Sequence, residues 1–166
     1  MSYQYEQFIS DLLKIKDRAT LAKLRHVFIR GQESHAFPTL GRLGVLNDEV
    51  LTAITGFYAI HQNHKKVGNF GRSLASLDAS SVEVHLQRLL NLNQTKAIRY
   101  MIPLVQHLDQ KKIAIDYYQL LLDLKSWGTN TKMRWASQFW LKGTDEINKT
   151  DETDEIDEMD ETDEKS

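Results

Sequence analysis

The chain has 166 residues, of which 41% are hydrophobic, 21 are Lys or Arg, 23 are Asp or Glu and none is Cys. This length and composition predict one globular domain or two small helical lobes, and they exclude a disulfide scaffold, a thiolate zinc site and a cysteine nucleophile. Neither the unbroken apolar stretch of a secretory signal nor a spanning run of roughly 18 to 20 apolar residues is present, so we expect a cytoplasmic protein.

Apolar residues recur at helical spacing along nearly the whole chain, which predicts an all-α fold of seven or eight helices. In chain order the helices are expected over residues 8–15, 17–30, 48–63, 72–77, 80–91, 94–109, 116–127 and 130–142. Four of these stripes are preceded by typical helix N-cap residues, namely Asp17, either Asn47 or Asp48, Asp116 and Asn130. The stretch 31–46 contains Pro38 and several glycines and is expected to be a looser connection.

Short connections between the expected helices favour antiparallel packing in a bundle-like arrangement. The glycine-containing stretch 64–73 is the best candidate for a junction between two lobes. We therefore expect an all-helical basic domain over residues 1–144, either undivided or formed by two lobes joined near 64–73.

The C-terminal segment 145–166 has a different composition, with 12 acidic and 2 basic residues. Residues 150–164 are five triplets, TDE TDE IDE MDE TDE, without helical or strand periodicity, which predicts a disordered acidic tail. Residues 1–144 keep 19 basic and 11 acidic residues, a net charge of +8. The basic body favours polyanionic partners, while the tail is either a solvating appendage or an intramolecular polyanion that competes with nucleic acid.

Signals for metal binding or catalysis are weak. His61 and His64 have the spacing that lets two imidazoles on a helix face one ion, but no acidic residue lies nearby, and Lys65 and Lys66 follow directly. Motifs of hydrolases, metalloproteases and phosphate-binding loops are missing, so neither an enzyme nor a cofactor is expected.

The basic residues are the most informative set. Lys65, Lys66 and Arg72 flank a turn between two glycines, where backbone N–H groups and flexible cations can approach a phosphate chain. Aromatic residues mostly fall on the apolar stripes, so stacking on bases is not expected. Three further pairs of basic residues lie on expected helices, namely Arg18 with Arg25, Lys96 with Arg99, and Lys132 with Arg134. Together with the net charge of +8, the pattern predicts a sequence-independent phosphate groove, to which Arg25, Arg99, Lys132 and Arg134 are assigned.

The order of several short segments resembles the small subunit of the type I-E CRISPR Cascade complex, the CasB family. These segments are LAKLRHVF, HQNHKKVGNFGRSLASL, HLQRLL and IDYYQLLLDLKSWG, followed by a final helix with Trp135, and the similarity covers about residues 5–141. The resemblance implies a non-enzymatic helical protein, present as two copies in a crRNA-guided surveillance complex and in contact with its backbone and large subunits. The acidic triplets are not part of the resemblance.

The resemblance also implies a role in the R-loop, in which the basic face helps to hold target DNA paired with crRNA and guides the displaced single strand. Arg25 lies in the matching LAKLR segment, and the matching glycine turn carries Lys65, Lys66 and Arg72. Further residues in segments that align in order are Arg42, Arg88, Arg99, Lys132 and Arg134. Two alternatives stay open: a structural helical adaptor whose basic face binds an acidic protein, and a dimeric DNA-binding regulator, although no recognition-helix pattern is present.

Overall fold

The computed structural model describes residues 2–77 and 80–141, and the predicted acidic tail lies outside these residues. The described part of the chain contains nine α-helices, two 3-10 helices and no strand, which confirms the all-α class. The elements are α1 Ser2–Leu13, α2 Arg18–Leu24, η1 Arg25–Phe28, η2 Glu33–Ala36, α3 Phe37–Leu43, α4 Glu49–Ile60, α5 Phe70–Ala75, α6 Ser80–Leu90, α7 Gln94–Gln110 and α8 Tyr117–Lys125, then a last helix over 129–141. None of the described helices is long and apolar enough to cross a membrane.

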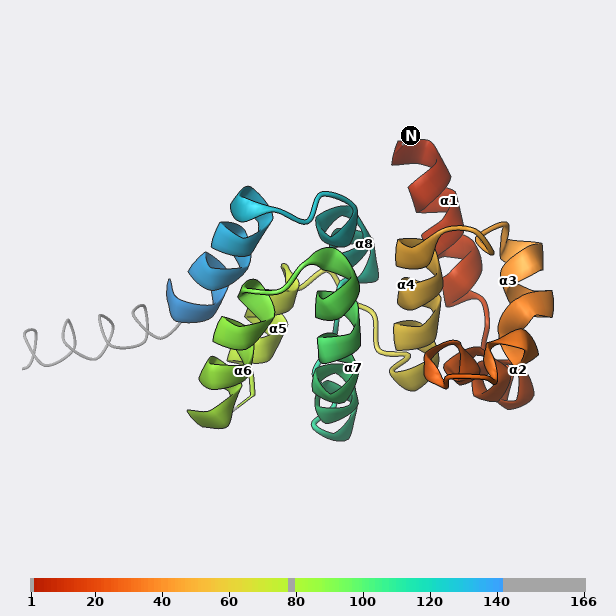
Figure 1. Cartoon of the computed structure of the whole chain (residues 1–166), viewed down its shortest axis with the longest axis horizontal. Coiled ribbons are helices and arrows are strands. Elements are labelled where there is room, and N and C mark those ends of the chain that lie inside the picture. The colour runs from red at the N-terminus through yellow and green to blue at the C-terminus, as the bar shows by residue number, and fades with distance from the viewer. Residues whose placement is uncertain (1, 78–79, 142–166) are drawn as a thin grey trace, which may run out of the picture.

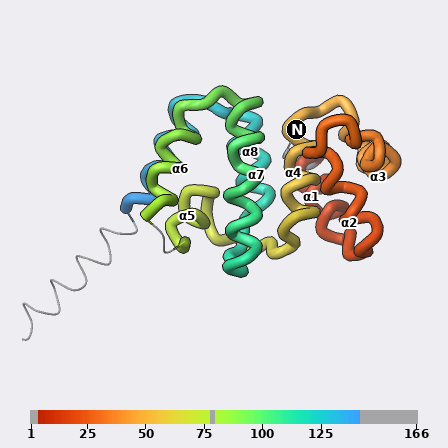
Figure 2. The backbone as a smooth tube through the Cα atoms, turned by 60° about the horizontal axis from the view of Figure 1, so that its bottom comes forward, coloured from red at the N-terminus to blue at the C-terminus, as the bar shows by residue number. Residues whose placement is uncertain are grey.

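The helices form two groups that lie side by side (Figures 1 and 2). One group contains α1 to α4, and the other contains α5 to α8 and the last helix. Helix α4 packs against both α7 and α8, and α1 packs against α8. Buried side chains of both groups, such as Phe57 of α4 and Leu121 of α8, belong to one hydrophobic cluster, so the two groups share a core. The division of the body into two lobes stays a prediction.

Three of the four predicted N-caps are confirmed. Asp17, Asp48 and Asp116 each accept a hydrogen bond of 2.9 to 3.0 Å from the backbone N–H three residues ahead. Each carboxylate thereby satisfies an N–H group that has no partner within the helix. The assignment of Asn130 as a cap was wrong, because the last helix begins at residue 129 and its first turn closes onto the carbonyl group of Gly128.

Residues 31–46 are more helical than the sequence predicts, because they contain η2 and α3. Pro38 lies in the first turn of α3, where its missing N–H group leaves no helical hydrogen bond unmade. Gly44 ends α3 with a φ of 75°, a conformation that glycine adopts without the steric clash of a Cβ atom. The proline and glycine that indicated a loose connection are therefore the start and stop signals of a short helix.

Helix α5 and the last helix cross in direct backbone contact at Gly71. A Cβ atom at Gly71 would overlap the carbonyl oxygen of Trp135 and lie 2.9 Å from its Cα atom. Trp135 is fully buried, and its indole N–H donates a 2.8 Å hydrogen bond to the carboxylate of Asp123, which is 1% exposed. Burial raises the pKa of Asp123, an effect opposed by hydrogen bonds from Trp135 and Gln119. This crossing places the first turn of α5 against the last helix.

Candidate nucleic-acid interface

The connection from α4 to α5, residues 61–69, is fixed against the segment that follows α7. The Ile115 N–H donates to the Asn63 carbonyl group at 3.0 Å, and the Lys65 N–H donates to the Ile115 carbonyl group at 3.3 Å. The Asn63 side chain also donates to the carbonyl group of Lys112 at 3.3 Å. These hydrogen bonds pair residues 63–65 with residues 112–115, although about fifty positions separate the two segments in the sequence.

The two histidines considered for metal binding hold this connection in place. His61 is 2% exposed, and its ring nitrogens lie 2.9 Å from Asp109 Oδ1 and 2.6 Å from the Ile113 carbonyl oxygen. The His64 Nδ1 atom accepts a 3.1 Å hydrogen bond from the backbone N–H of Tyr117. Within the described residues, no group of three or more metal-ligating side chains is close enough to hold an ion. Both histidines therefore have a structural role, because their ring nitrogens form hydrogen bonds that fix the connection.

Basic residues from three segments meet at the connection. The connection itself carries two lysines, two more follow α7, and α5 contributes an arginine. The first turn of α5 is held to the same segment, because the Ser73 hydroxyl group donates to the Ala114 carbonyl group at 2.8 Å. We call the five residues the linker cluster: Lys65, Lys66, Arg72, Lys111 and Lys112.

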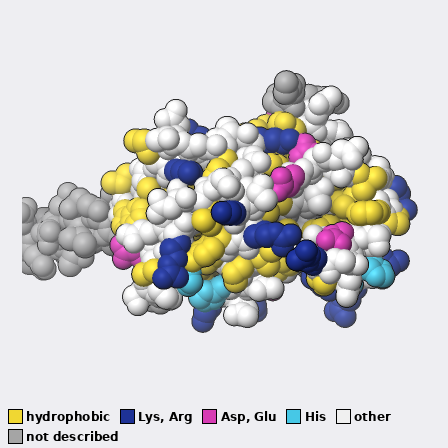
Figure 3. Space-filling model, in the orientation of Figure 1, with side chains coloured by type: hydrophobic (Ala, Val, Ile, Leu, Met, Phe, Trp, Pro, Cys, Tyr) yellow, Lys and Arg dark blue, Asp and Glu magenta, His cyan; other side chains and the backbone are white. Residues whose placement is uncertain are grey.

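All members of the linker cluster are exposed, and none forms an ion pair with another described residue. Two carboxylates lie nearby, but Asp109 is hydrogen-bonded to His61, and Asp116 caps α8. Five cations against two carboxylates leave this region positively charged. On the face shown in Figure 3, Lys and Arg side chains are spread over the middle of the molecule, with single acidic side chains among them. Such a surface attracts phosphate groups by charge without reading bases.

Lys111 and Lys112 were not among the residues expected from the sequence. A signal was present, since two adjacent lysines directly follow the apolar stripe of α7, where the chain has to turn. Lys112 has a φ of 57°, which marks that turn. Their position beside Lys65, however, depends on the backbone pairing between distant segments.

Two predicted arginines lie at the edge of the linker cluster. The Arg25 Nη1 atom donates a 3.2 Å hydrogen bond to the Ala59 carbonyl group at the end of α4, where the helix dipole favours a cation. Arg134 lies where the last helix meets Asn69, whose side chain donates to the Arg134 carbonyl group at 3.1 Å. Its guanidinium group lies 3.9 Å from the carboxylate of Asp123. Both arginines therefore also stabilise the fold.

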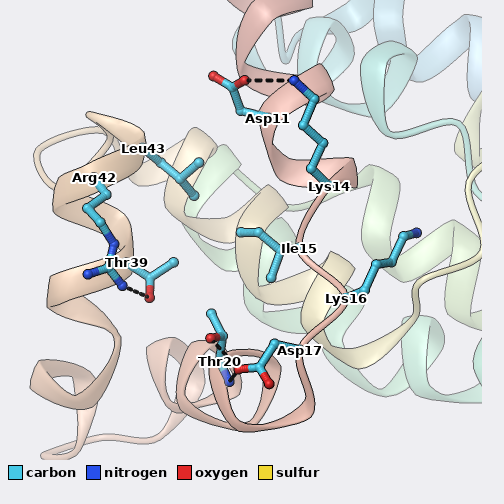
Figure 4. A pocket seen from close by; sticks show the side chains of 9 residues that line it. All are labelled: Asp11, Lys14, Ile15, Lys16, Asp17, Thr20, Thr39, Arg42 and Leu43. Atoms are coloured by element: carbon cyan, nitrogen blue, oxygen red, sulfur yellow. Dashed lines mark hydrogen bonds and ion pairs between the residues drawn. The ribbon is translucent and has the colours of Figure 1, made fainter.

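Arg42 lies away from the linker cluster, in an open pocket of about 490 Å³ between α3 and the segment joining α1 to α2 (Figure 4). Lys14 and Lys16 line the same pocket, but so do Asp11 and Asp17. Lys14 lies 3.9 Å from Asp11, and the Arg42 guanidinium group donates to the Thr39 hydroxyl group at 3.4 Å. Charges in this pocket are mixed, so it is a weaker phosphate site than the linker cluster.

The other three predicted residues are dispersed. Arg99 lines a second pocket together with Asp48, near the start of α4, whereas the linker cluster lies beyond the end of that helix. Arg88 is exposed on α6. The Lys132 Nζ atom lies 5.4 Å from the ring centre of Trp127, a cation–π contact on the last helix. The structure thus brings together only part of the predicted set, namely Lys65, Lys66 and Arg72 with Arg25 and Arg134 at the edge.

Comparisons with known proteins relate this fold to one family. The family model described as CRISPR-associated protein Cse2 matches residues 17–140. A search of curated proteins finds no match to the chain.

Solved structures share the fold. CasB from Thermus thermophilus matches with a TM-score of 0.68 and 20% identity, over 84% of this chain and 97% of that one. The M. ruber CasB structure matches with a TM-score of 0.69 and 19% identity, over 87% and 97%. A chain of a CRISPR RNA-guided surveillance complex matches with a TM-score of 0.70 and 20% identity, over 90% and 98%. The helical arrangement described above is therefore similar to that of CasB structures.

Proposed function

The chain belongs to the Cse2 family of CRISPR-associated proteins, and from this premise we propose that it is a non-catalytic subunit of a CRISPR RNA-guided surveillance complex that binds nucleic-acid backbone through the linker cluster. The family match agrees with the CasB resemblance found in the sequence and confirms it. A match to a chain of such a complex supports the assignment to an assembly. Its partners are then the backbone and large subunits, a second copy of the chain, crRNA paired with target DNA, and displaced single-stranded DNA.

The observation that carries the proposal is the gathering, along one connection, of exposed cations from three segments that form no ion pair with another described residue. A cation that already pairs with a carboxylate must give up that partner before it binds phosphate, whereas no carboxylate of the described part of the chain has to leave the linker cluster. The long side chains of lysine can follow a flexible backbone, and they carry no pattern that distinguishes one base from another. This chemistry favours contact with single-stranded DNA at any sequence.

Three of the largest aromatic side chains of the body lie in the core, whereas Phe37 and Trp140 are exposed on α3 and on the last helix. Tyr58, Tyr117 and Trp135 are fully buried, so they are not available for stacking on bases. In a guided complex, base pairing with crRNA recognises the sequence, and the protein has only to stabilise the separated strands. A basic surface that does not recognise bases is suited to stabilising the separated strands. We propose that its role is to stabilise the R-loop.

The test is a titration of the full chain with fluorescent single-stranded DNAs of unrelated sequence over a salt series. Binding through about five phosphates predicts a slope of roughly −3.5 for log affinity against log salt, with similar affinities for all sequences. The variant Lys65→Ala/Lys66→Ala/Arg72→Ala removes three contacts and is expected to reduce the size of this slope by about 2.

A charge-matched control distinguishes binding at the linker cluster from general electrostatic attraction of DNA to the basic body. Arg18→Ala/Lys23→Ala/Lys96→Ala removes the same charge from α2 and from the start of α7, and Lys96 lies about 21 Å along α7 from Gln110, the residue before Lys111. This control is expected to leave the slope nearly unchanged. If both variants reduced the slope equally, binding would depend on net charge alone. If the native chain had a slope near zero and captured an acidic protein instead, the alternative of a structural adaptor would be favoured.

A further inference from the structure

The described part of the last helix ends near Arg72, a member of the linker cluster. The Gln138 side-chain oxygen accepts a 2.9 Å hydrogen bond from the backbone N–H of Asn69. A Cβ atom at Gly68 would meet both this oxygen and the Cδ atom of Arg72 at 2.8 Å, so Gln138 and Arg72 flank the same glycine. Gln138 lies only three residues before Leu141, the last residue that the structure describes. The chain therefore leaves the described fold about one helical turn from a member of the cluster.

The sequence beyond this point carries the opposite charge. Residues 145–166 contain 12 acidic and 2 basic residues. Asp145 is four positions after Leu141, which limits its distance from that residue to about 14 Å even for a fully extended chain. The first carboxylate of the triplet run, Asp151, is ten positions after Leu141 and so lies within about 36 Å of it. Acidic residues are thus tethered close to Arg72, a member of the linker cluster, whose five cations form no ion pair within the described part of the chain.

From this placement we infer that the acidic segment 145–166 docks on the linker cluster of its own chain and competes there with nucleic acid. The inference rests on the proposed function, because it concerns the regulation of the same surface. The contact is electrostatic, since the triplet run offers ten carboxylates and only two apolar side chains. The order of the residues within the acidic segment is unimportant, because the cluster recognises their charge and not their shape.

The strength of the competition follows from the tether. A short tether gives an effective concentration of about 1 mM, and weak non-specific polyelectrolyte contacts have dissociation constants near 0.1 mM, so docking lowers the apparent affinity for DNA about tenfold. Salt shortens the range of the attraction, from a Debye length of about 10 Å at 0.1 M to about 3 Å at 1 M, and weakens both contacts. A long DNA strand brings more phosphates than the segment has carboxylates, so a strand delivered by an assembled complex displaces it. The free subunit is meanwhile protected from non-specific binding.

Lysine reactivity tests the docking without nucleic acid. A neutral-tail variant, with every Asp→Asn and every Glu→Gln between residues 151 and 164, keeps the length of the chain. At low salt, an amine-acetylating reagent is expected to modify Lys65, Lys66 and Lys112 several-fold more slowly in the native chain than in this variant, as measured by mass spectrometry. Lys96 serves as an internal control with equal rates in both proteins. Equal rates at the cluster lysines, or protection that disappears on dilution, would overturn intramolecular docking.

DNA affinity then tests the competition. The neutral-tail variant is expected to bind single-stranded DNA about tenfold more tightly than the native chain at low salt, whereas a shuffled tail of native composition binds like the native one. In the Lys65→Ala/Lys66→Ala/Arg72→Ala background the gain is expected to shrink markedly. Acetylation protection without DNA binding by any form would overturn the proposed function and leave docking intact. DNA binding that is indifferent to the tail, without protection, would overturn only the inference.

Discussion

Gly71→Ala is expected to destabilise the protein by about 3 kcal/mol, at the upper end of the cost of overpacking a core. The added Cβ atom would overlap the carbonyl oxygen of Trp135 and lie 2.8 Å from its carbonyl carbon. Both are backbone atoms of the last helix, so no rotamer change can relieve the clash and α5 has to move away from that helix. The midpoint and slope of urea unfolding measure the loss.

Gly41→Ala is the matched control, because it also places alanine inside a short helix. The nearest atom to a Cβ there is the Cδ1 atom of Leu46 at 3.4 Å, the end of a side chain that is 48% exposed. Alanine is favoured over glycine in a helix, so this variant is expected to gain about 0.5 to 1 kcal/mol. If Gly71→Ala were equally stabilising, the close crossing of α5 and the last helix would be disproved.

Asp123→Ala is expected to destabilise the protein by about 1 to 3 kcal/mol, because it leaves the indole N–H of buried Trp135 without its acceptor. Asp123→Asn keeps one side-chain oxygen at nearly the same place and is expected to lose less. Thermal or urea unfolding of the two variants provides the comparison. Equal losses would mean that the hydrogen bond to Trp135 contributes little.

The difference in stability between Asp123→Asn and the native protein is expected to depend on pH. Burial is the main cause that raises the pKa of Asp123 in the folded state above the ordinary aspartate value of 3.8. Between the unfolded and folded pKa values the folded chain holds a proton that the unfolded chain has released, so the stability contributed by Asp123 declines as pH rises through this interval and is constant above it. Asp123→Asn lacks this titration, so its stability relative to the native protein is expected to improve as pH rises from acid. A relative stability that falls with rising pH would contradict the raised pKa.

The linker cluster and the stability of the last helix are connected through one crossing. Gly71 precedes Arg72, and the last helix that it contacts also carries Gln138, which binds the backbone of Asn69. A variant that separates α5 from the last helix is therefore expected to disturb the cluster as well as the core. For this reason the nucleic-acid tests use exposed cluster residues, whose removal leaves the crossing intact.

Features that depend on neighbours within one helical turn could be predicted from the order of the amino acids alone. Helical spacing of apolar residues identified the all-α class, and Asp17, Asp48 and Asp116 were recognisable as caps because each bonds an N–H only three residues away. The order of short motifs indicated the family, and the contrast between a basic body and an acidic tail was plain from composition. A local signal led to a wrong prediction at Pro38, because a proline can begin a helix as well as end one. The sequence indicated a loose connection there, whereas Pro38 lies in the first turn of α3.

Which basic residues share a surface depends on how distant segments of the chain pack, so the three-dimensional fold was needed to identify them. Lys111 and Lys112 lie beside Lys65 because hydrogen bonds join two segments about fifty positions apart, and no local spacing encodes that pairing. Arg42 and Arg99 appear equivalent to Lys66 in the sequence, yet the fold places each of them in a pocket that also contains carboxylates. The reason is physical: a charge pattern along a chain specifies which side chains are solvated, whereas the packing of the core between distant helices determines where those side chains meet.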